Sequence, residues 1–221
     1  MANETVLILA DGDASAVDSL RKLAASADVI LAADGGYVKA LQHGIQVDEV
    51  IGDLDSIPEE EKKALLESEA PAVHAFPEEK DWTDLELAID HALTLRPASI
   101  HLFGVLGSRL DHSITAVHLL EKGLNSAVSI VLHTKEESAR LIENPTELEW
   151  AAAGDRVSLI PMTETVCVTT EGLRFPLRRE RLERAASRGV SNVVERLPVR
   201  IDVSEGRLLV VHAAKQGDGN G

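Results

Sequence analysis

The stretch Val47-Asp48-Glu49-Val50-Ile51-Gly52-Asp53-Leu54-Asp55-Ser56 places two aspartates directly behind a short apolar run. The run indicates a short buried strand, although Asp48 and Glu49 interrupt it. If the chain stays extended beyond Ile51, Asp53 and Asp55 point to the same side, because side-chain direction alternates along a strand. Neighbouring carboxylates repel each other unless a cation or proton lies between them, and hard oxygen ligands favour Mg²⁺ or Ca²⁺. The pair therefore predicts a metal site, with Asp55 as a turn or helix cap as the alternative.

The same succession of strand, acidic or glycine turn and helix recurs over the first two thirds of the chain. Expected strands are Thr5–Ala10, Asp28–Ala33, Val47–Ile51, Val73–Phe76, Ser99–Phe103 and Ala127–His133. Expected helices are Ser15–Ala25, Tyr37–Gln42, Pro58–Ser68, Thr83–Leu95 and Asp111–Lys122. This alternation predicts an α/β fold with a doubly wound, mostly parallel sheet. In such sheets ligands bind beyond the carboxyl ends of the strands, where Asp11, Asp34, Asp53 and Gly104 all lie.

The pattern changes near residues 142–145, where short alternating runs replace the helices. The runs expected as strands are Leu148–Ala151, Arg156–Ile160, Thr165–Thr169, Val199–Val203 and Arg207–Val211. The charged segment Arg178–Arg188 is expected to be a short helix or a surface loop. Short strands without intervening helices predict a small C-terminal antiparallel β-sandwich. The expected division is a first domain over 1–143, a second over 144–214, and a flexible tail over 215–221.

Composition excludes several classes of protein. Asp and Glu number 37 against 22 Lys and Arg, for a formal net charge of −15, which argues against a nucleic-acid surface. No segment has the length of a membrane span. Cys167 is the single cysteine, so an internal disulfide is excluded and a reducing compartment, the cytoplasm, is expected. Because Cys167 lies in an alternating run, we expect a buried structural thiol.

A second acidic cluster, Lys80-Asp81-Trp82-Thr83-Asp84-Leu85-Glu86, precedes an amphipathic helix. Thr83 and Glu86 have the spacing of a capping box, so Asp81 and Asp84 could serve only the helix N-terminus. The preceding strand, however, delivers this helix start to the same sheet edge as Asp53. Three or four carboxylates around one cleft are typical of Mg²⁺ ions that bridge phosphates.

The third cluster is Gly104-Val105-Leu106-Gly107-Ser108-Arg109-Leu110-Asp111-His112. Glycines allow the backbone to approach an anion, and Arg109 can hold a phosphate, although a plain strand-to-helix turn explains the glycines equally well. Neither a P-loop nor a dinucleotide fingerprint is present. The apolar-run histidines have no zinc-ligand spacing and are expected to serve packing or surface roles: His74, His101, His118 and His133.

Taken together and in order, these motifs resemble the thiamine pyrophosphokinase family. The matching segments are Ala33-Asp34-Gly35-Gly36, Gly52-Asp53-Leu54-Asp55-Ser56, Lys80-Asp81-x-Thr83-Asp84-x-Glu86, Gly104-x-x-Gly107-x-Arg109-x-Asp111-His112, Gly172-Leu173 and Gly189-Val190-Ser191-Asn192. The resemblance covers nearly the whole chain. Two positions depart from the bacterial pattern: Ser108 stands where a second Gly is common, and Ala116 where Asn is frequent.

The resemblance implies an enzyme that transfers the pyrophosphoryl group of ATP to the hydroxyl of thiamine, with Mg²⁺ as cofactor and AMP as the other product. It implies a nucleotide-binding first domain, a thiamine-binding second domain, and a homodimer with sites formed between subunits. Asp53, Asp55 and Asp84 would be the catalytic and metal-binding carboxylates, and Ser191 and Asn192 would face thiamine. The nucleotide side would consist of Asp34, Gly35, Gly36, Lys80, Asp81, Thr83, Gly107, Arg109, Asp111 and His112.

Two other readings of the same residues remain open from the sequence. An apolar run followed by an Asp-x-Asp pair, here Asp53-Leu54-Asp55, is also found in Mg²⁺-dependent phosphohydrolases that form a phospho-aspartate. Against that reading, Asp53 follows the third expected strand instead of the first. The other alternative is a non-catalytic module that binds ATP without releasing AMP.

Overall fold

The computed structural model describes residues 4–215 and divides into two compact units, Met1–Lys135 and Glu136–Gly221. The division falls eight residues before the expected boundary at 143, because the strand over residues 137–142 pairs within the second unit. Of the expected tail over 215–221, only Lys215 is among the described residues. No helix between residues 4 and 215 is long and apolar enough to cross a membrane.

The first unit is built on a sheet in which every pairing between its six strands is parallel, over the part of the unit that is described. The strands are β1 (Thr5–Leu9), β2 (Val29–Ala33), β3 (Glu49–Gly52), β4 (Ala72–Ala75), β5 (Ser99–Phe103) and β6 (Ser129–His133). Their order is β6-β5-β1-β2-β3-β4. The inner strands are continuous apolar runs because helices cover both faces; in β1, for example, Val6, Leu7 and Ile8 are fully buried.

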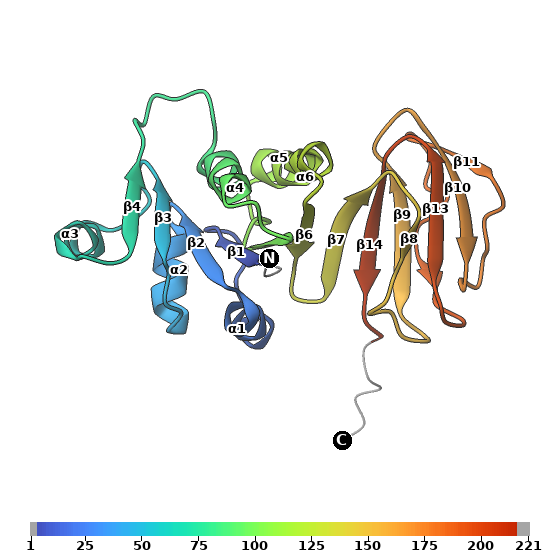
Figure 1. The fold of residues 1–221 in the computed structure, drawn as a ribbon, viewed down its shortest axis with the longest axis horizontal. Coiled ribbons are helices and arrows are strands. Elements are labelled where there is room, and N and C mark those ends of the chain that lie inside the picture. Colours follow the sequence, from blue (N-terminus) through green and yellow to red (C-terminus); the bar gives the residue numbers. More distant parts are fainter. Residues whose placement is uncertain (1–3, 216–221) are drawn as a thin grey trace, which may run out of the picture. The chain divides into compact units, whose positions relative to one another are not determined.

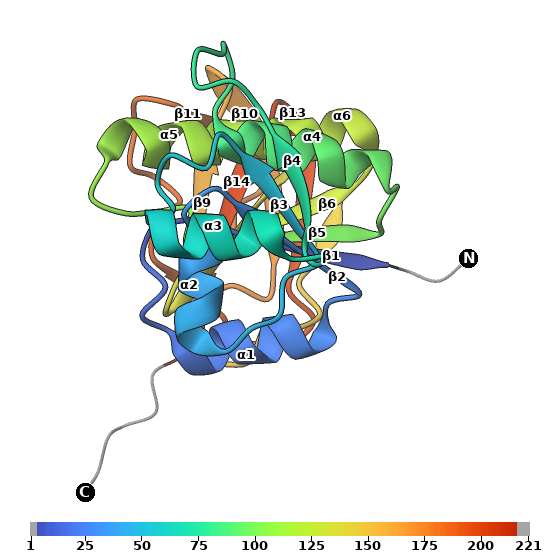
Figure 2. The same ribbon diagram turned by 90° about the vertical axis from the view of Figure 1, so that its left-hand side faces the viewer.

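Helices α1 (Val17–Ser26) and α2 (Gly36–His43) lie on one face of this sheet, and α4 (Asp84–Thr94), α5 (Leu110–Leu119) and α6 (Glu121–Ser126) lie on the other (Figures 1 and 2). Helix α3 (Glu59–Glu67) connects β3 to β4 at the sheet edge. The single helix expected over Asp111–Lys122 is instead α5 and α6. Gly123 in α6 packs closely on Val128 and Ile130, and a Cβ at this position would lie 2.5 Å from the Val128 carbonyl oxygen.

The connections confirm the doubly wound topology. From β1 the chain moves outward through β2 and β3 to β4, then returns to β5 on the other side of β1. The connection after β1 runs to β2, and the connection after β5 runs in the opposite direction to β6. Two adjacent connections that diverge in this way leave a crevice at the carboxyl ends of β1 and β5. The fold therefore places the loops that follow β1, β2, β3 and β5 at one edge of the sheet.

The second unit consists of two antiparallel sheets, in the orders β12-β9-β14-β7 and β11-β10-β13-β8. The strands are β7 (Glu137–Ile142), β8 (Thr146–Glu147), β9 (Arg156–Pro161), β10 (Thr165–Glu171), β11 (Glu180–Glu183), β12 (Asn192–Val193), β13 (Arg200–Glu205) and β14 (Leu208–Ala213). Val157 and Leu159 from one sheet and Val168 and Ile201 from the other belong to one buried cluster. The expected β-sandwich is confirmed.

Two expectations for the second unit are wrong. Leu148–Ala151 is a turn and not a strand: the Ala151 N–H donates to the Leu148 carbonyl at 3.2 Å, which buries both apolar ends of the segment. The segment Arg178–Arg188 is neither helix nor plain loop, since β11 within it pairs with β10. Its alternate side chains explain the strand, because Leu182 is buried while the charged neighbours Arg181 and Glu183 are exposed.

Candidate active site

A pocket of about 440 Å³ lies within the first unit, at the carboxyl edge of the parallel sheet. Its volume is within the range of sites for small molecules and cofactors. The loops after β1, β2, β3 and β5 and the first turns of α4 and α5 line it. The lining residues are Ala10, Asp11, Gly12, Ala33, Asp34, Gly35, Asp53, Asp55, Ser56, Thr83, Asp84, Leu85, Gly104, Val105, Gly107, Ser108, Arg109, His112 and Thr115.

Close backbone contact between two loops shapes the floor of this pocket. The Gly12 N–H donates to the Gly104 carbonyl at 2.5 Å, which joins the loops after β1 and β5 across the crevice. A Cβ at Gly12 would lie 2.3 Å from the carbonyl oxygens of Gly104 and Leu106. Only glycine permits this approach, so residue 12 is determined by packing of backbone on backbone.

The aspartate pair does not leave β3 in an extended conformation, and that expectation is wrong. Leu54, between the two aspartates, has a left-handed φ of 64°, and the Asp55 N–H donates to Asp53 Oδ1 at 3.2 Å. Leu54 adopts this turn because its side chain is buried among Ala32, Val50 and Leu65. The turn still brings the carboxylates together: Asp34, Asp53 and Asp55 each offer a ligand atom within 4.8 Å of the others.

Asp84 is the fourth carboxylate of the cluster, and it approaches Asp34 closely because Gly52 has no side chain between them. A Cβ at Gly52 would lie 2.9 Å from Asp84 Oδ1 and 3.0 Å from Asp34 Cβ. Asp34 Oδ1 and Asp84 Oδ1 are both buried, and neither has a hydrogen-bond partner among residues 4–215. Buried carboxylate oxygens without partners are unfavourable, which makes these two atoms candidates for metal ligation.

Lys80 is the cation within the cluster. Its ammonium donates a hydrogen bond to Asp53 Oδ2 and lies 3.0 Å from Asp84 Oδ1, although the angle at the latter is not that of a hydrogen bond. Partial burial alone would raise the pKa of Asp53, but the hydrogen bonds from Lys80 and from the Asp55 backbone outweigh it and lower that pKa. Burial would lower the pKa of Lys80, yet its two carboxylate partners raise it. Lys80 therefore stays charged and neutralises part of the cluster.

Asp34 lies in the opposite electrostatic situation. Burial raises its pKa, and the charges of Asp84 and Asp55 raise it further, while hydrogen bonds from Ser56 and the Gly35 backbone offset only part of the effect. The Asp34 backbone has a left-handed φ of 45° and donates its N–H to the Ile51 carbonyl at 2.9 Å. The ionised cluster is thus under internal repulsion that a divalent cation would relieve.

We expect Asp34→Asn to raise the melting temperature at about pH 7 in buffer without divalent metal, because the amide has no charge to bury. Asn also tolerates the left-handed backbone. Because the pKa of Asp34 is raised in the folded state, its ionised form lowers the stability of the wild type at pH values above the ordinary pKa of 3.8. Below that pH the carboxyl is protonated in both states, so the Tm difference between Asp34→Asn and wild type should disappear. For a chain of this size, each kcal/mol gained raises Tm by about 2–4 °C. Circular dichroism melts on both sides of that pKa measure the effect; a neutral-pH Tm below wild type contradicts the prediction.

Arg109 and Asp111 form an exposed ion pair at the start of α5, with Arg109 Nη2 donating to Asp111 Oδ2 at 2.6 Å. The hydrogen bond from Arg109, with one from the His112 backbone, lowers the pKa of Asp111 to about 2. Arg109 and His112 line the pocket, whereas Asp111 instead orients the guanidinium. Arg109 is therefore held at the pocket mouth with donors available for an anion.

The structure separates the remaining expected nucleotide-side residues. Gly35 and Gly107 line the pocket, and so does Thr83, which caps α4 by accepting from the Glu86 N–H at 3.2 Å. Thr83 therefore caps the helix, whereas Asp84 lies with the other carboxylates of the site. Asp81 is exposed and not part of the lining. Gly36 is buried, with its Cα facing the Leu9 carbonyl.

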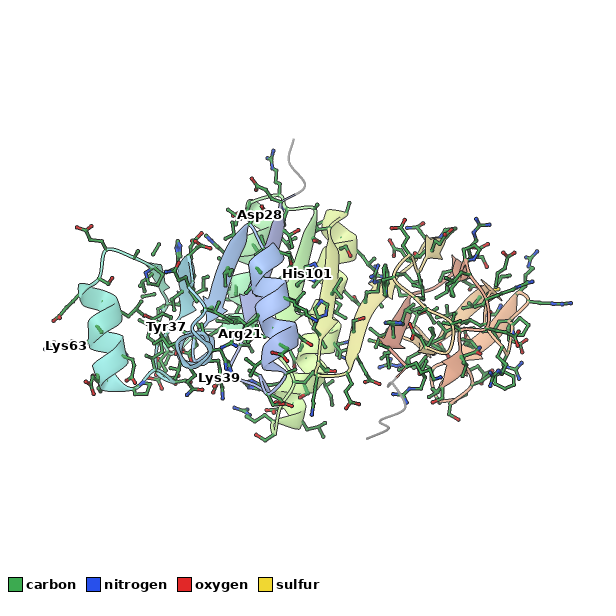
Figure 3. All side chains as sticks on the ribbon, turned by 90° about the horizontal axis from the view of Figure 1, so that it is seen from below. Arg21, Asp28, Tyr37, Lys39, Lys63 and His101 are labelled. Atoms are coloured by element: carbon green, nitrogen blue, oxygen red, sulfur yellow. The ribbon has the colours of Figure 1, made fainter. Side chains whose placement is uncertain are left out.

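Sequence reasoning noted Asp11 at a strand end but did not assign it to the site. Asp11 lines the pocket and lies 3.7 Å from the ammonium of Lys39. Lys39, which is labelled in Figure 3, belongs to α2. The available signal was its position just beyond β1, where the pairing of Leu9 with Ala32 places Asp11 level with Asp34 beyond β2. Ser108, one of the departures from the family pattern, also lines the pocket, and Ala116, the other, is buried in α5.

Ser191 and Asn192 lie in the second unit. Ser191 is exposed, with a left-handed φ of 61°. Asn192 is buried, and its amide holds the backbone of Phe175: Oδ1 accepts from the Phe175 N–H at 3.0 Å, and Nδ2 donates to the Phe175 carbonyl at 2.7 Å. Phe175 itself is 63% exposed. Asn192 thus fixes a loop that presents an aromatic ring to solvent.

Comparison with known proteins agrees with this geometry. Residues 20–132 match the family described as "Thiamin pyrophosphokinase, catalytic domain", and residues 141–208 match "Thiamin pyrophosphokinase, vitamin B1 binding domain". The chain is 30% identical to the thiamine pyrophosphokinase of Bacillus subtilis (strain 168) over 213 residues, which cover 95% of this chain and 99% of the relative.

Solved structures give the same result. The crystal structure of thiamine pyrophosphokinase from Bacillus subtilis has a TM-score of 0.86 and 29% identity, over 96% of this chain and 100% of the other. That of thiamin pyrophosphokinase from Geobacillus thermodenitrificans has a TM-score of 0.83 and 27% identity, over 96% and 99%. With both family domains matched in order and a full-length relative at this identity, the chain belongs to the thiamine pyrophosphokinase family.

Proposed function

We propose that this chain transfers the pyrophosphoryl group of ATP to the hydroxyl of thiamine, and that the pocket of the first unit holds ATP with Mg²⁺. One observation carries the proposal: four carboxylates and Lys80 converge beside the Arg109 loop at the carboxyl edge of the sheet. With all four aspartates ionised, one ammonium leaves the cluster strongly negative. An anionic nucleotide binds such a site only with cations that offset this charge.

The residues present fit Mg²⁺. The donor set consists of hard carboxylate oxygens, and the buried Oδ1 atoms of Asp34 and Asp84, which have no hydrogen-bond partner among residues 4–215, supply the kind of ligand that Mg²⁺ prefers. Asp53, Asp55 and Asp84 would hold the ion, with Asp34 in support. When bound, Mg²⁺ offsets phosphate charge and stabilises the oxygen that leaves with AMP.

The chain's own residues position the reactants. Arg109 faces the pocket from its ion pair with Asp111 and can contact the phosphates through its planar fork. Gly107 and Gly12 have no side chains, so an anion in the pocket can approach their backbone closely. Lys80 holds Asp53 and Asp84 in place. Phosphoryl transfer through a loose transition state needs little assistance from a base, so positioning and charge supply most of the catalysis.

The direct test of the reaction is incubation with ATP, Mg²⁺ and thiamine, followed by chromatographic separation of the nucleotides. We expect AMP and thiamine diphosphate in equal amounts, because the β-phosphorus is attacked. ADP with thiamine monophosphate would overturn the reaction assigned. Nucleotide binding without any AMP would instead favour a non-catalytic module.

A single in-line displacement inverts configuration at the β-phosphorus. A covalent intermediate, in which an aspartate first takes the pyrophosphoryl group as AMP leaves and then passes it to the thiamine hydroxyl, gives two inversions. We therefore expect inversion when chiral β-labelled ATP is the substrate. Retention would show that an aspartate, with Asp53 the first candidate, acts as a nucleophile.

The second unit, in this proposal, binds thiamine, and the chain acts as a homodimer with sites formed between subunits. The exposed Ser191 contacts thiamine, while Asn192 is a positioning residue that holds the Phe175 loop. The matched vitamin B1 binding domain over residues 141–208 supports this division. Analytical ultracentrifugation tests the dimer. The single cysteine supports a reducing compartment such as the cytoplasm.

We expect Asn192→Ala to raise the KM for thiamine about tenfold, equivalent to about 1.4 kcal/mol, while the KM for ATP stays within about twofold. The physical reason is that the Phe175 backbone loses its two side-chain hydrogen bonds, each contributing about 0.5–1.5 kcal/mol. Steady-state kinetics with each substrate varied in turn measures the split. The control is Asn144→Ala, an exposed residue near the turn before β8. Equal increases in both KM values would contradict the positioning role.

A further inference from the structure

A second group of ligand-type side chains lies outside the pocket, and it consists of Glu49, His74 and His91. Glu49 Oε2 lies 2.5 Å from His74 Nε2 and 2.8 Å from His91 Nε2. The imidazole centroids are 4.5 Å apart. The side chains are 21%, 40% and 26% exposed, respectively, so an ion from solvent can reach the point on which they converge.

The parallel sheet brings these three residues together. Ile51 of β3 is in register with His74 of β4, and Glu49 lies two residues before Ile51, so Glu49 and His74 occupy the same face of the sheet. Helix α4 packs against β3 on that face and supplies His91 from its last turn. The C-terminal end of a helix favours a nearby cation. Three separate elements thus contribute one ligand each.

The chemistry of the donors differs from that of the pocket. Two imidazole nitrogens and one carboxylate form a set that binds Zn²⁺ with a fourth position open to water, whereas Mg²⁺ prefers oxygen alone. We propose that Glu49, His74 and His91 form a binding site for a transition-metal ion of the Zn²⁺ class, separate from the carboxylate pocket.

Little movement is needed to admit the ion. A carboxylate oxygen only accepts hydrogen bonds, so both rings present Nε2 to Glu49, and one divalent ion can take the place of the two shared protons. Metal–ligand distances of about 2.0–2.2 Å in a tetrahedral site separate the ligand atoms by roughly 3.3–3.5 Å. The present nitrogen–oxygen separations must therefore open by somewhat less than 1 Å, which a small rotation of the partly exposed Glu49 provides.

Metal at this site would join the elements that carry the carboxylate cluster. Asp53 follows β3, four residues beyond Glu49, and Asp84 begins α4, seven residues before His91. An ion bound by β3, β4 and α4 therefore stabilises the scaffold of the pocket without entering it. The net charge of −15 favours any cation.

Isothermal titration of the full chain with ZnCl₂, in excess Mg²⁺ to saturate the carboxylate pocket, tests the proposal. We expect the wild type to bind one equivalent of Zn²⁺. His74→Gln and His91→Gln should each lower the Zn²⁺ affinity by at least ~10- to 100-fold, the loss typical when only a residue that supports a metal ligand is removed. The control, His118→Gln, alters an exposed histidine of α5 and should bind as wild type does. NMR should show the imidazole signals of His74 and His91 shifting as Zn²⁺ is added.

A second readout does not depend on affinity. Co²⁺ in a site with two nitrogens and one oxygen should develop visible absorption of tetrahedral type, and the His74→Gln/His91→Gln double variant should lack it. Circular dichroism of the variants verifies that they are folded. Zn²⁺ binding by the double variant at wild-type affinity, or no Zn²⁺ bound by the wild type, would overturn the proposal and leave Glu49 as an acceptor for two imidazoles.

Discussion

Replacing Asp53 or Asp55 by Asn should reduce kcat for thiamine diphosphate formation by about 10²- to 10³-fold, comparable with removal of a single electrostatic group from other active sites. Each substitution keeps the shape of the side chain and removes one negative oxygen donor from a cluster whose ligand atoms lie within 4.8 Å of one another. Fewer anionic donors hold Mg²⁺ less tightly and position the phosphates less well. Asp53→Asn weakens the ion pair with Lys80, but the fold should remain, because Asp84 still lies 3.0 Å from the Lys80 ammonium and neither substituted carboxylate belongs to a hydrophobic cluster.

Steady-state rates over a range of Mg²⁺ concentrations, with circular dichroism spectra of each variant, measure this effect. Asp18→Asn is the matched control, since Asp18 is an exposed carboxylate of α1 that does not line the pocket. It should keep wild-type activity. Full activity of Asp53→Asn or Asp55→Asn at saturating Mg²⁺ would remove that residue from the proposed metal site.

The second large effect is expected on stability. Lys80→Met should lower the free energy of unfolding by about 3 kcal/mol, the lower end of the range for breaking a buried ion pair. The Lys80 and Asp53 side chains are only 8% and 10% exposed, so two carboxylates would lose their compensating charge where water screens them poorly. Urea denaturation in metal-free buffer measures the loss.

The pKa shifts give the pH dependence of this effect. The lowered pKa of Asp53 means that its contribution is present above the ordinary value of 3.8 and disappears as the pH falls through its folded-state pKa. The raised pKa of Lys80 means that its contribution persists up to the ordinary value of 10.5 and is lost only as the pH rises through its folded-state pKa. The difference between Lys80→Met and wild type should therefore be largest across the neutral range.

Lys63→Met is the control for Lys80→Met. Lys63, on α3 (Figure 3), also pairs with an acid four residues later, Glu67, but at 3.9 Å and with side chains 75% and 69% exposed. An exposed pair of this kind contributes about 0–1 kcal/mol. Addition of Mg²⁺ should restore part of the stability of Lys80→Met and none for Lys63→Met. Equal losses for the two variants would show that Lys80 does not compensate the cluster.

Local patterns were sufficient for much of the fold. Continuous apolar runs and amphipathic helices are properties of short segments, and a parallel sheet covered on both faces is the arrangement that buries them all. The strand ends then place Asp11, Asp34, Asp53 and Gly104 at one edge of the sheet, because carboxyl ends of parallel strands meet there. The strand β7 and the turn Leu148–Ala151 were not predicted, since the same apolar residues suit several local structures until their partners are known.

The sequence by itself determined the doubly wound first unit and the antiparallel sandwich, because both follow from the order and periodicity of apolar residues. The family was indicated separately, by the resemblance of the ordered motifs to thiamine pyrophosphokinases. Tertiary structure alone decided the left-handed turn at Leu54, the placement of Lys80 between Asp53 and Asp84, and the use of Asn192 to hold Phe175. It also decided that Glu49, His74 and His91 meet, although no spacing in the sequence indicates a site. The physical reason is that side chains from different elements meet only through sheet register and helix packing, which no single segment encodes.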